Sequence, residues 1–364
     1  MNPIKAPEQS GAVLKERARF ERNFLAVALF LLVLIFSFNF LINPYGLYPT
    51  KLLRPLVWSD RKEKIELLRS CVPQPEVLIL GSSRMMRIDP ALVEKLTGRP
   101  AFNLAVDHAR TEDFLALLRY VIFSLGYVPS TVIVGVDVNN FRGYYEMDNL
   151  LTYYPELLYY LKEERQNRFV MAAETAWIKF IKGLSLHQSE KSFESCKRYL
   201  ESGHWENSYQ FSPNGDLIYN RQEDGNELRA ERLKAGIERA IITYRYEFTG
   251  FGGFSEQRIS YFRLLAALCH REHIRLVAVI EPYQGQFLEK MRGSEFERIN
   301  QRWLDYIRQA ALDQKIELID AFDPQAFGYD PQGFYDEVHM TEANMDLLIE
   351  WVLRGGGAGG KDSF

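Results

Sequence analysis

The stretch Val77-Leu78-Ile79-Leu80-Gly81-Ser82-Ser83-Arg84 decides the fold of this chain. Four apolar residues in a row predict a strand that is buried on both faces, and the glycine ends it. The two serines then follow at the carboxyl end of that strand, where open parallel sheets bind their ligands. A glycine–serine turn by itself is a weak signal, so its meaning depends on the rest of the chain.

The same kind of apolar segment returns four more times. Apolar strands separated by helices are typical of a parallel sheet covered on both faces. The expected fold class is therefore α/β, a three-layer α/β/α sandwich with a five-stranded, mainly parallel sheet. Strands are predicted over residues 76–80, 101–106, 131–136, 274–280 and 316–319, and helices over about 59–70, 91–96, 112–125, 254–272, 297–311 and 341–353.

A long insertion separates the third and fourth strands. Residues 140–254 are too many for a simple crossover between neighbouring strands. Helices are predicted there over about 149–163, 169–181 and 226–246, and Ser212-Pro213-Asn214-Gly215-Asp216 is a strong turn signal. We interpret the insertion as a helical lid or side lobe.

The segment from Phe24 to Ile42 predicts a transmembrane helix in a lipid bilayer. Only Ser37 and Asn39 are polar in it, and no residue is charged. About 19 helical residues span roughly 28 Å, close to the hydrocarbon thickness of a bilayer. A cleaved signal peptide and a buried core helix are the alternatives. The residues that follow, Asn43-Pro44-Tyr45-Gly46, offer no small-x-small cleavage site.

The distribution of basic residues predicts the orientation of this helix. Lys15, Arg17, Arg19 and Arg22 precede it, whereas the first basic residue after it is Lys51. This asymmetry predicts a single-pass protein of the cytoplasmic (inner) membrane, with its N-terminus inside and its large domain outside. The predicted division is a cytoplasmic tail over 1–23, the transmembrane helix over 24–42, a linker and helix over 43–70, the main domain with its insertion over 71–354, and a flexible tail over 355–364.

The composition is that of an ordinary folded protein. Of the 364 residues, 47% are hydrophobic and 25% charged, and the formal net charge of −4 gives no reason to expect a nucleic-acid partner. Three cysteines allow at most one disulfide, so the fold does not depend on a disulfide framework. Cys269, His270 and His273 lack a matching second pair of ligands, and we expect neither a metal nor a cofactor.

A second motif, Asp336-Glu337-Val338-His339, lies just before the last predicted helix. A serine hydroxyl needs a base to become a nucleophile at neutral pH, and His339 can be that base for Ser83. Asp336 can accept a hydrogen bond from the other imidazole nitrogen and fix its tautomer. The order predicts a serine hydrolase or acyltransferase, with Ser82 as the rival nucleophile. The alternatives are a plain turn and a histidine beside a helix cap.

The Gly-Ser-Ser turn, the order Ser83, Asp336, His339 and the α/β pattern resemble the SGNH (GDSL-type) hydrolase superfamily, whose fold is flavodoxin-like. The membrane anchor and the insertion are similar to envelope O-acyltransferase accessory proteins of the D-alanyl-teichoic-acid and alginate-acetylation kind. The resemblance implies Ser83 as the nucleophile and a bacterial membrane-bound O-acyltransferase as a partner. It covers about 75–136 and 274–350, and the insertion stays unmatched.

Two blocks depart from the family pattern. The block that usually gives an oxyanion-hole glycine reads Asn103-Leu104-Ala105-Val106-Asp107-His108, and the Gly-x-Asn-Asp block reads Gly135-Val136-Asp137-Val138-Asn139. Asn139 is the remaining amide donor, since an ionised Asp137 donates nothing. Arg84 either binds an anionic substrate group or pairs with Asp137. We expect Asp107 and His108 to line the cleft.

Together these features predict a membrane-anchored serine acyltransferase or esterase outside the membrane, acting on a cell-envelope glycan or exopolysaccharide. The alternative is a noncatalytic scaffold that binds glycan or the membrane-bound O-acyltransferase. A phosphate-binding loop is disfavoured, because the glycine-rich phosphate motifs are absent. Aromatic residues of the insertion either stack on sugar rings or belong to the core, and they are Tyr144, Tyr145, Tyr153, Tyr154, Tyr159, Tyr160, Trp177 and Trp205.

Overall fold

A computed structural model describes residues 9–56, 59–143, 151, 154–162, 168–203, 209–219 and 226–356. The chain forms two compact units, Met1–Trp58 with Asn167–Glu206, and Ser59–Gln166 with Asn207–Phe364. This division differs from the predicted one, because part of the insertion belongs with the N-terminal segment. Tyr144, Tyr145, Tyr153, Trp205 and residues 357–364 lie outside the described residues.

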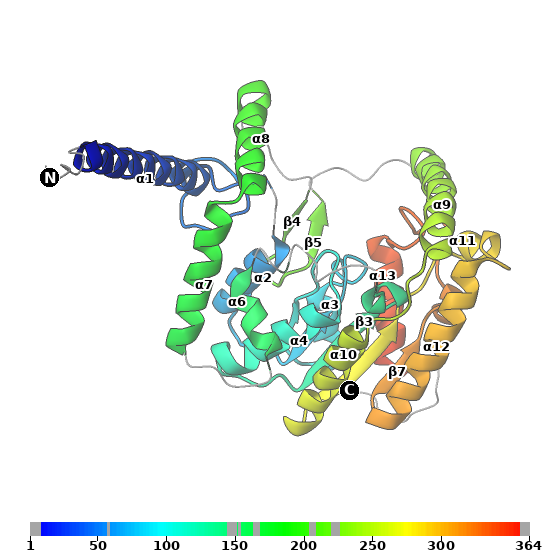
Figure 1. The fold of residues 1–364 in the computed structure, drawn as a ribbon. Coiled ribbons are helices and arrows are strands. Elements are labelled where there is room, and N and C mark those ends of the chain that lie inside the picture. The colour runs from blue at the N-terminus through cyan, green and yellow to red at the C-terminus, as the bar shows by residue number, and fades with distance from the viewer. Residues whose placement is uncertain are drawn as a thin grey trace, which may run out of the picture. The chain divides into compact units, whose positions relative to one another are not determined.

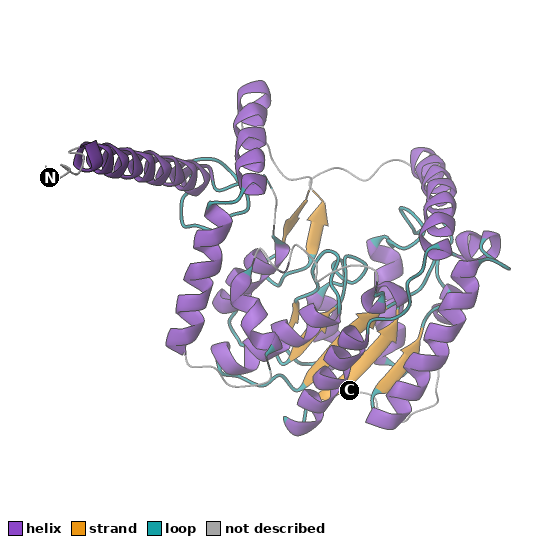
Figure 2. Ribbon diagram, in the orientation of Figure 1, coloured by secondary structure: helices purple, strands orange, loops and turns teal. Residues whose placement is uncertain are grey.

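The larger unit contains the five-stranded parallel sheet expected from the sequence (Figure 2). Its strand order is β2-β1-β3-β6-β7, and every neighbouring pair is parallel. The predicted fold class is confirmed. The strands are β1 (Val77–Leu80), β2 (Ala101–Asn103), β3 (Thr131–Val136), β6 (Arg275–Ile280) and β7 (Glu317–Asp320).

Helices cover both faces of this sheet (Figure 1). Helix α10 packs beside α4 and α12, while α3 packs against α13. The structure also contains α2, whose first residue follows the predicted boundary at Ser59. The bounds are α2 (Asp60–Ser70), α3 (Pro90–Thr97), α4 (Thr111–Tyr120), α10 (Glu256–Arg271), α12 (Glu295–Gln314) and α13 (Glu342–Leu353).

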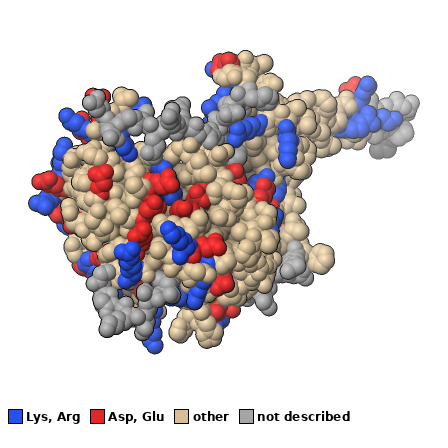
Figure 3. Space-filling view, turned by 180° about the vertical axis from the view of Figure 1, so that it is seen from behind, with Lys and Arg blue, Asp and Glu red and all other residues tan. Residues whose placement is uncertain are grey.

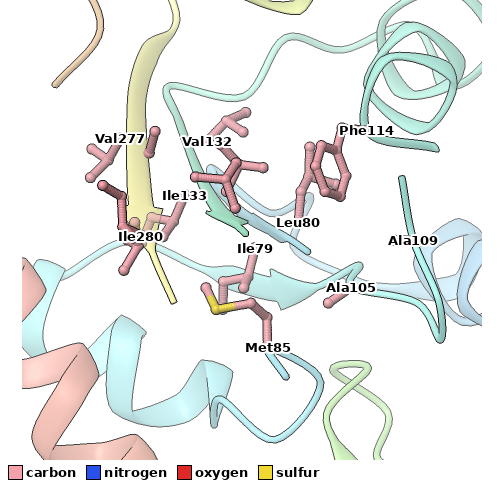
Figure 4. Packing of buried hydrophobic residues seen from close by; sticks show 14 of the residues in the cluster. Ile79, Leu80, Met85, Ala105, Ala109, Phe114, Val132, Ile133, Val277 and Ile280 are labelled. Carbon is pink, nitrogen blue, oxygen red and sulfur yellow. The ribbon is translucent and has the colours of Figure 1, made fainter. Parts of the chain in front are cut away.

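The apolar strands form the centre of the core. All residues of β1, β2 and β3 are buried, as are those of β6 from its second residue onward. Figure 4 shows Ile79, Val132 and Val277 from three neighbouring strands packed with Met85 and other apolar side chains. Because parallel strands with helices on both faces meet no water, continuous apolar runs were a reliable signal for them.

Several boundaries differ from the predictions. The predicted strand over 101–106 ends at Asn103, although Leu104 and Val106 still donate backbone hydrogen bonds to Ile79 and Gly81, at 2.8 and 3.0 Å. At this end of the strand, the Asn103 side chain donates to the carbonyls of Met85 and Ile88. Helix α4 continues as a π-helical turn, Val121–Leu125.

The insertion contains more elements than predicted. Its described helices are α6 (Pro155–Leu158) with the 3-10 turn Tyr159–Leu161, α7 (Arg168–Gly183), α8 (Leu186–Ser202) and α9 (Asn226–Thr249), and α11 (Gly285–Lys290) follows β6. The turn signal joins two short antiparallel strands, β4 (Tyr209–Phe211) and β5 (Leu217–Tyr219). This hairpin is held at the sheet, because Asn103 donates to Asn214 O at 2.9 Å and Leu217 to Met86 O at 2.8 Å.

The smaller unit contains the apolar N-terminal helix. Helix α1 (Gln9–Ile42) begins before the predicted segment, and its part Val13–Ile42 is long and apolar enough to cross a membrane. In Figure 3 basic side chains gather towards its N-terminal end, and most of the surface between them and the base of the helix is tan. Helices α7 and α8 pack against its C-terminal part.

Candidate active site

The turn after β1 places Ser83 at the carboxyl end of the sheet. Gly81 has φ of +152°, and a Cβ there would lie 2.4 Å from Met85 Cγ, so glycine is required. The Met85 N–H donates to Ser82 O at 3.0 Å and closes the turn. The next helix along the chain, α3, begins only at Pro90.

A tight loop before α13 presents Asp336 and His339. The Tyr335 N–H donates to His339 O at 2.8 Å, and Phe334 pairs with Met340 in an antiparallel bridge. The Asn344 side chain donates to Gly333 O at 2.8 Å and ties the loop to the first turn of α13. These bonds keep the two side chains on the same side of the loop.

Ser83, His339 and Asp336 form a connected chain of hydrogen bonds. Ser83 Oγ lies 2.9 Å from His339 Nε2, and His339 Nδ1 lies 2.7 Å from Asp336 Oδ2. The other carboxylate oxygen of Asp336 accepts the backbone N–H groups of Val338 at 2.9 Å and His339 at 2.7 Å. Because the carboxylate accepts the Nδ1 proton, Nε2 is left as the acceptor for the serine hydroxyl.

Asp336 and His339 each shift the pKa of the other. Burial lowers the pKa of His339, but the hydrogen bond and negative charge of Asp336 outweigh it, so the His339 pKa is raised. Burial would raise the pKa of Asp336, but its hydrogen bonds with His339 lower it overall. Asp336 therefore stays ionised and stabilises the imidazolium that forms when His339 takes a proton.

Arg84 lies beneath this group in a buried ionic cluster. Its Nη1 lies 2.8 Å from Asp137 Oδ2 and its Nε 3.3 Å from Glu281 Oε2, and it also donates to Pro282 O. The guanidinium lies over the Tyr283 ring, 4.5 Å from the centroid. Of the two roles weighed for Arg84, the structure shows the pairing with Asp137.

Sequence reasoning missed Glu281. This residue follows β6 directly and is 1% exposed, and burial raises the pKa of its carboxyl to about 8. A Cβ at Gly135 would lie 2.4 Å from Glu281 Oε1, so the glycine in β3 makes room for the carboxyl. A glutamate at the end of an apolar strand was the available signal, since strand ends in such sheets carry functional groups.

A cavity of about 640 Å³ opens beside Ser83. It is lined by Ser82, Ser83, His108, Asn139 and His339, and by arginines and carboxylates that include two ion pairs, Arg84 with Asp137 and Arg142 with Glu247. Arg142, for example, lies 2.7 Å from Glu247. A polar cavity of this size suits a ligand with many hydrogen-bonding groups.

The predicted oxyanion and substrate residues that line this cavity differ in their exposure and in their hydrogen bonds. The His108 backbone has a left-handed φ of +51°, and its side chain is exposed. Asn139 lines the cavity with its amide 3.5 Å from Asp137 Oδ2. Ser82 is buried, and its Oγ accepts the Arg84 N–H at 3.4 Å, whereas it is the Ser83 Oγ that lies within hydrogen-bond reach of His339.

A second cavity of about 220 Å³ is also lined by Ser83 and His339. Asp107 lines it, and its backbone N–H donates to Asp60 Oδ2 at 3.0 Å. The rest of the wall combines Arg84 and Arg87 with apolar and aromatic side chains, which come largely from the hairpin and the Asp336 loop: Met86, Tyr209, Leu217, Tyr219, Tyr335 and Met340. The structure therefore places Asp107 and His108 at different cavities, although they are neighbours in the sequence.

No protein-family model matches the chain, and no curated protein matches it. Among solved structures, one described as a "putative acylhydrolase" from Bacteroides fragilis NCTC 9343 is similar over 81% of this chain and 93% of its own, with 11% identity and a TM-score of 0.34. A "GDSL-like lipase" from Bacteroides thetaiotaomicron VPI-5482 is similar over 81% and 94%, with 14% identity and a TM-score of 0.35. Likeness at this level assigns no activity to this chain.

Proposed function

We propose that this protein is a membrane-anchored serine acyltransferase or esterase of the SGNH-like kind, acting outside the cytoplasmic membrane on a cell-envelope glycan. The observation that carries the proposal is the hydrogen-bonded chain from Ser83 through His339 to Asp336. Its three members come from two distant segments, and their order of contact is that of nucleophile, base and orienting acid.

The geometry supports a two-step acyl transfer. His339 Nε2 takes the proton of Ser83 Oγ as the oxygen attacks the carbonyl carbon of an acyl ester. The resulting tetrahedral intermediate collapses, the acyl–oxygen bond breaks, and His339 returns the proton to the leaving alcohol. A sugar hydroxyl or water then attacks the acyl-serine while His339 removes its proton. The bond between the acyl carbon and Ser83 Oγ breaks, and His339 returns that proton to Ser83 Oγ.

The oxyanion of each intermediate needs hydrogen-bond donors beside Ser83. We assign this role to the backbone N–H groups of Ser83 and His108 and to the Asn139 amide. Ser83, His108 and Asn139 all line the 640 Å³ cavity. The backbone of His108, the last residue of the block that lacks the family's glycine, is left-handed, a conformation that glycine adopts most readily. One such donor contributes about 3–4 kcal/mol to the transition state.

The two cavities suggest how donor and acceptor share the site. The smaller one is lined by aromatic and aliphatic side chains together with Arg87, whose guanidinium lies over the Tyr219 and Tyr335 rings, and its volume of about 220 Å³ suits a short acyl chain. The larger one is lined by polar and charged side chains, and its 640 Å³ suits one or more sugar units. Ser83 and His339 line both, so an acyl-serine would stand between the acyl group's cavity and the acceptor.

A fluorophosphonate probe tests the activated serine directly. The full chain in detergent is treated alongside Ser83→Ala, His339→Ala and Ser82→Ala. We expect labelling of the wild type and of Ser82→Ala, and its loss in the other two variants. An unlabelled wild type that is folded by circular dichroism would instead favour the noncatalytic scaffold, and labelling lost only in Ser82→Ala would move the nucleophile to Ser82.

A further inference from the structure

Over residues 169–183, the part whose side chains are described, helix α7 has an exposed face that is entirely apolar. Its polar residues Glu174, Thr175, Lys179 and Lys182 are all less exposed than this face. The exposed residues of its described part, 169–183, are Phe169, Val170, Ala172, Ala173, Ala176, Trp177, Phe180 and Ile181. Trp177 is 62% exposed and Phe169 85%. Helices on the surface of a water-soluble domain show the opposite arrangement, so this face calls for an apolar environment.

The same helix contacts the C-terminal end of the apolar span. The rings of Phe36 in α1 and Phe180 in α7 lie 5.4 Å apart, and a Cβ at Gly183 would lie 2.6 Å from Phe36 Cδ2. Tyr48, just after α1, donates its hydroxyl hydrogen to Lys179 O at 2.8 Å. The exposed face of α7 is thus continuous with the apolar surface of α1.

A polar residue of the span is bonded within the same unit. Asn39 donates its side-chain amide to Gly183 O and to Ser189 Oγ, both at 2.9 Å, and accepts from Ser192 Oγ at 2.8 Å. Amides inside a bilayer need such partners because lipid supplies none. The end of α7 and the start of α8 therefore belong at the depth of Asn39, inside the predicted span from Phe24 to Ile42.

We infer that the exposed face of α7 lies in the lipid bilayer, at the outer interface beside α1. The inference rests on the proposed membrane anchor. With 16 residues, α7 reaches roughly 24 Å, which is short of a second span. In Figure 1 it runs across the direction of α1, so it lies along the membrane plane when α1 crosses the membrane. Interfacial helices adopt this position, with lysine heads reaching the lipid headgroups.

Site-specific fluorescence quenching tests this position. The full chain, carrying Cys71→Ser and Cys196→Ser, keeps the buried Cys269 and receives one new cysteine labelled with an environment-sensitive dye. Test positions are Ala173→Cys and Ala176→Cys. Val33→Cys reports the middle of α1, and Leu312→Cys reports an exposed apolar position in α12 of the other unit. Each protein is reconstituted into phosphatidylcholine–phosphatidylglycerol vesicles with doxyl lipids.

We expect a blue shift and loss of emission at both α7 positions, stronger with the doxyl group near the headgroup than near the chain end. Val33 should show the reverse depth preference, and Leu312 no quenching. Quenching at Val33 without quenching at Ala173 and Ala176 would overturn the inference while leaving the anchor intact, and the face would then belong to a protein partner. No quenching at Val33 would overturn the anchor as well.

Discussion

Replacing Asp336 by asparagine tests the catalytic geometry in the most informative way. One Asp336 oxygen accepts the backbone N–H groups of Val338 and His339, at 2.9 and 2.7 Å. The carbonyl oxygen of an asparagine can accept the same two hydrogen bonds. The amide nitrogen then faces His339 Nδ1, where the carboxylate oxygen lay at 2.7 Å. A donor at this place moves the imidazole proton to Nε2, which can no longer accept the proton of Ser83.

The expected loss is large because the tautomer is wrong while the fold is kept. An equivalent change in a serine triad lowers the rate about 10⁴-fold, which corresponds to about 5 kcal/mol in the activation free energy. Asp336→Asn also removes the negative charge that raises the pKa of His339, so any remaining activity should have its midpoint at lower pH.

The assay is the second-order rate of fluorophosphonate labelling, measured with Asp330→Asn as the matched control. Asp330 lies on the same loop, is exposed and accepts the Gln332 N–H at 2.9 Å, a bond that asparagine keeps. The control should label within about twofold of the wild type. A rate for Asp336→Asn within about tenfold of the wild type would refute the assigned role of the carboxylate.

Three further expectations follow from the same cluster. The rate of labelling should rise with pH through the raised pKa of His339, because only the neutral imidazole accepts the serine proton. A rate that falls from about pH 6.5 upward would contradict this. Gly135→Ala puts a Cβ 2.3 Å from Met85 Cγ, so urea unfolding should show a loss of about 1–3 kcal/mol in the free energy of unfolding. The control is Gly250→Ala, where an added Cβ meets nothing within 4 Å, and it should change this free energy by less than about 1 kcal/mol. Because the pKa of Glu281 is raised from an ordinary 4.5 to about 8, the stabilisation from its bound proton is fully present below pH 4.5 and is lost as the pH rises from there through 8. Glu281→Gln should therefore flatten the fall in unfolding free energy over that range, and an unchanged slope would show that this carboxyl does not titrate there.

The sequence predicted the sheet well because its strands carry their own signal. Thr131–Val136 is apolar throughout and has the predicted bounds, since a central parallel strand is buried on both faces. The contact between Ser83 and the distant Asp336–His339 segment was also predictable. Ser83 follows a strand, and Asp336 lies three residues before His339 on one loop. The two motifs supply the reactive side chains, and the fold brings Ser83 and His339 together.

Other features depend on contacts that no local pattern shows. Helix α8 is polar and was missed, because part of its support comes from Asn39 on α1. The β4–β5 hairpin consists of two three-residue strands, too short for an alternating pattern, and is held by backbone bonds to Asn103 and Met86. Trp177 was predicted either to belong to the core or to contact a sugar, yet it is 62% exposed. Its surroundings depend on where α7 lies, which no local pattern shows.

The most direct test of the central claim is to look for the acyl-serine itself. The full chain is incubated briefly with p-nitrophenyl acetate, quenched with acid and digested, and the peptide that contains Ser83 is analysed by mass spectrometry. The account predicts an acetyl group on Ser83 that is absent in His339→Ala and that disappears from the wild type when a sugar acceptor is added. Acetylation confined to other residues, or equal in His339→Ala, would contradict the account.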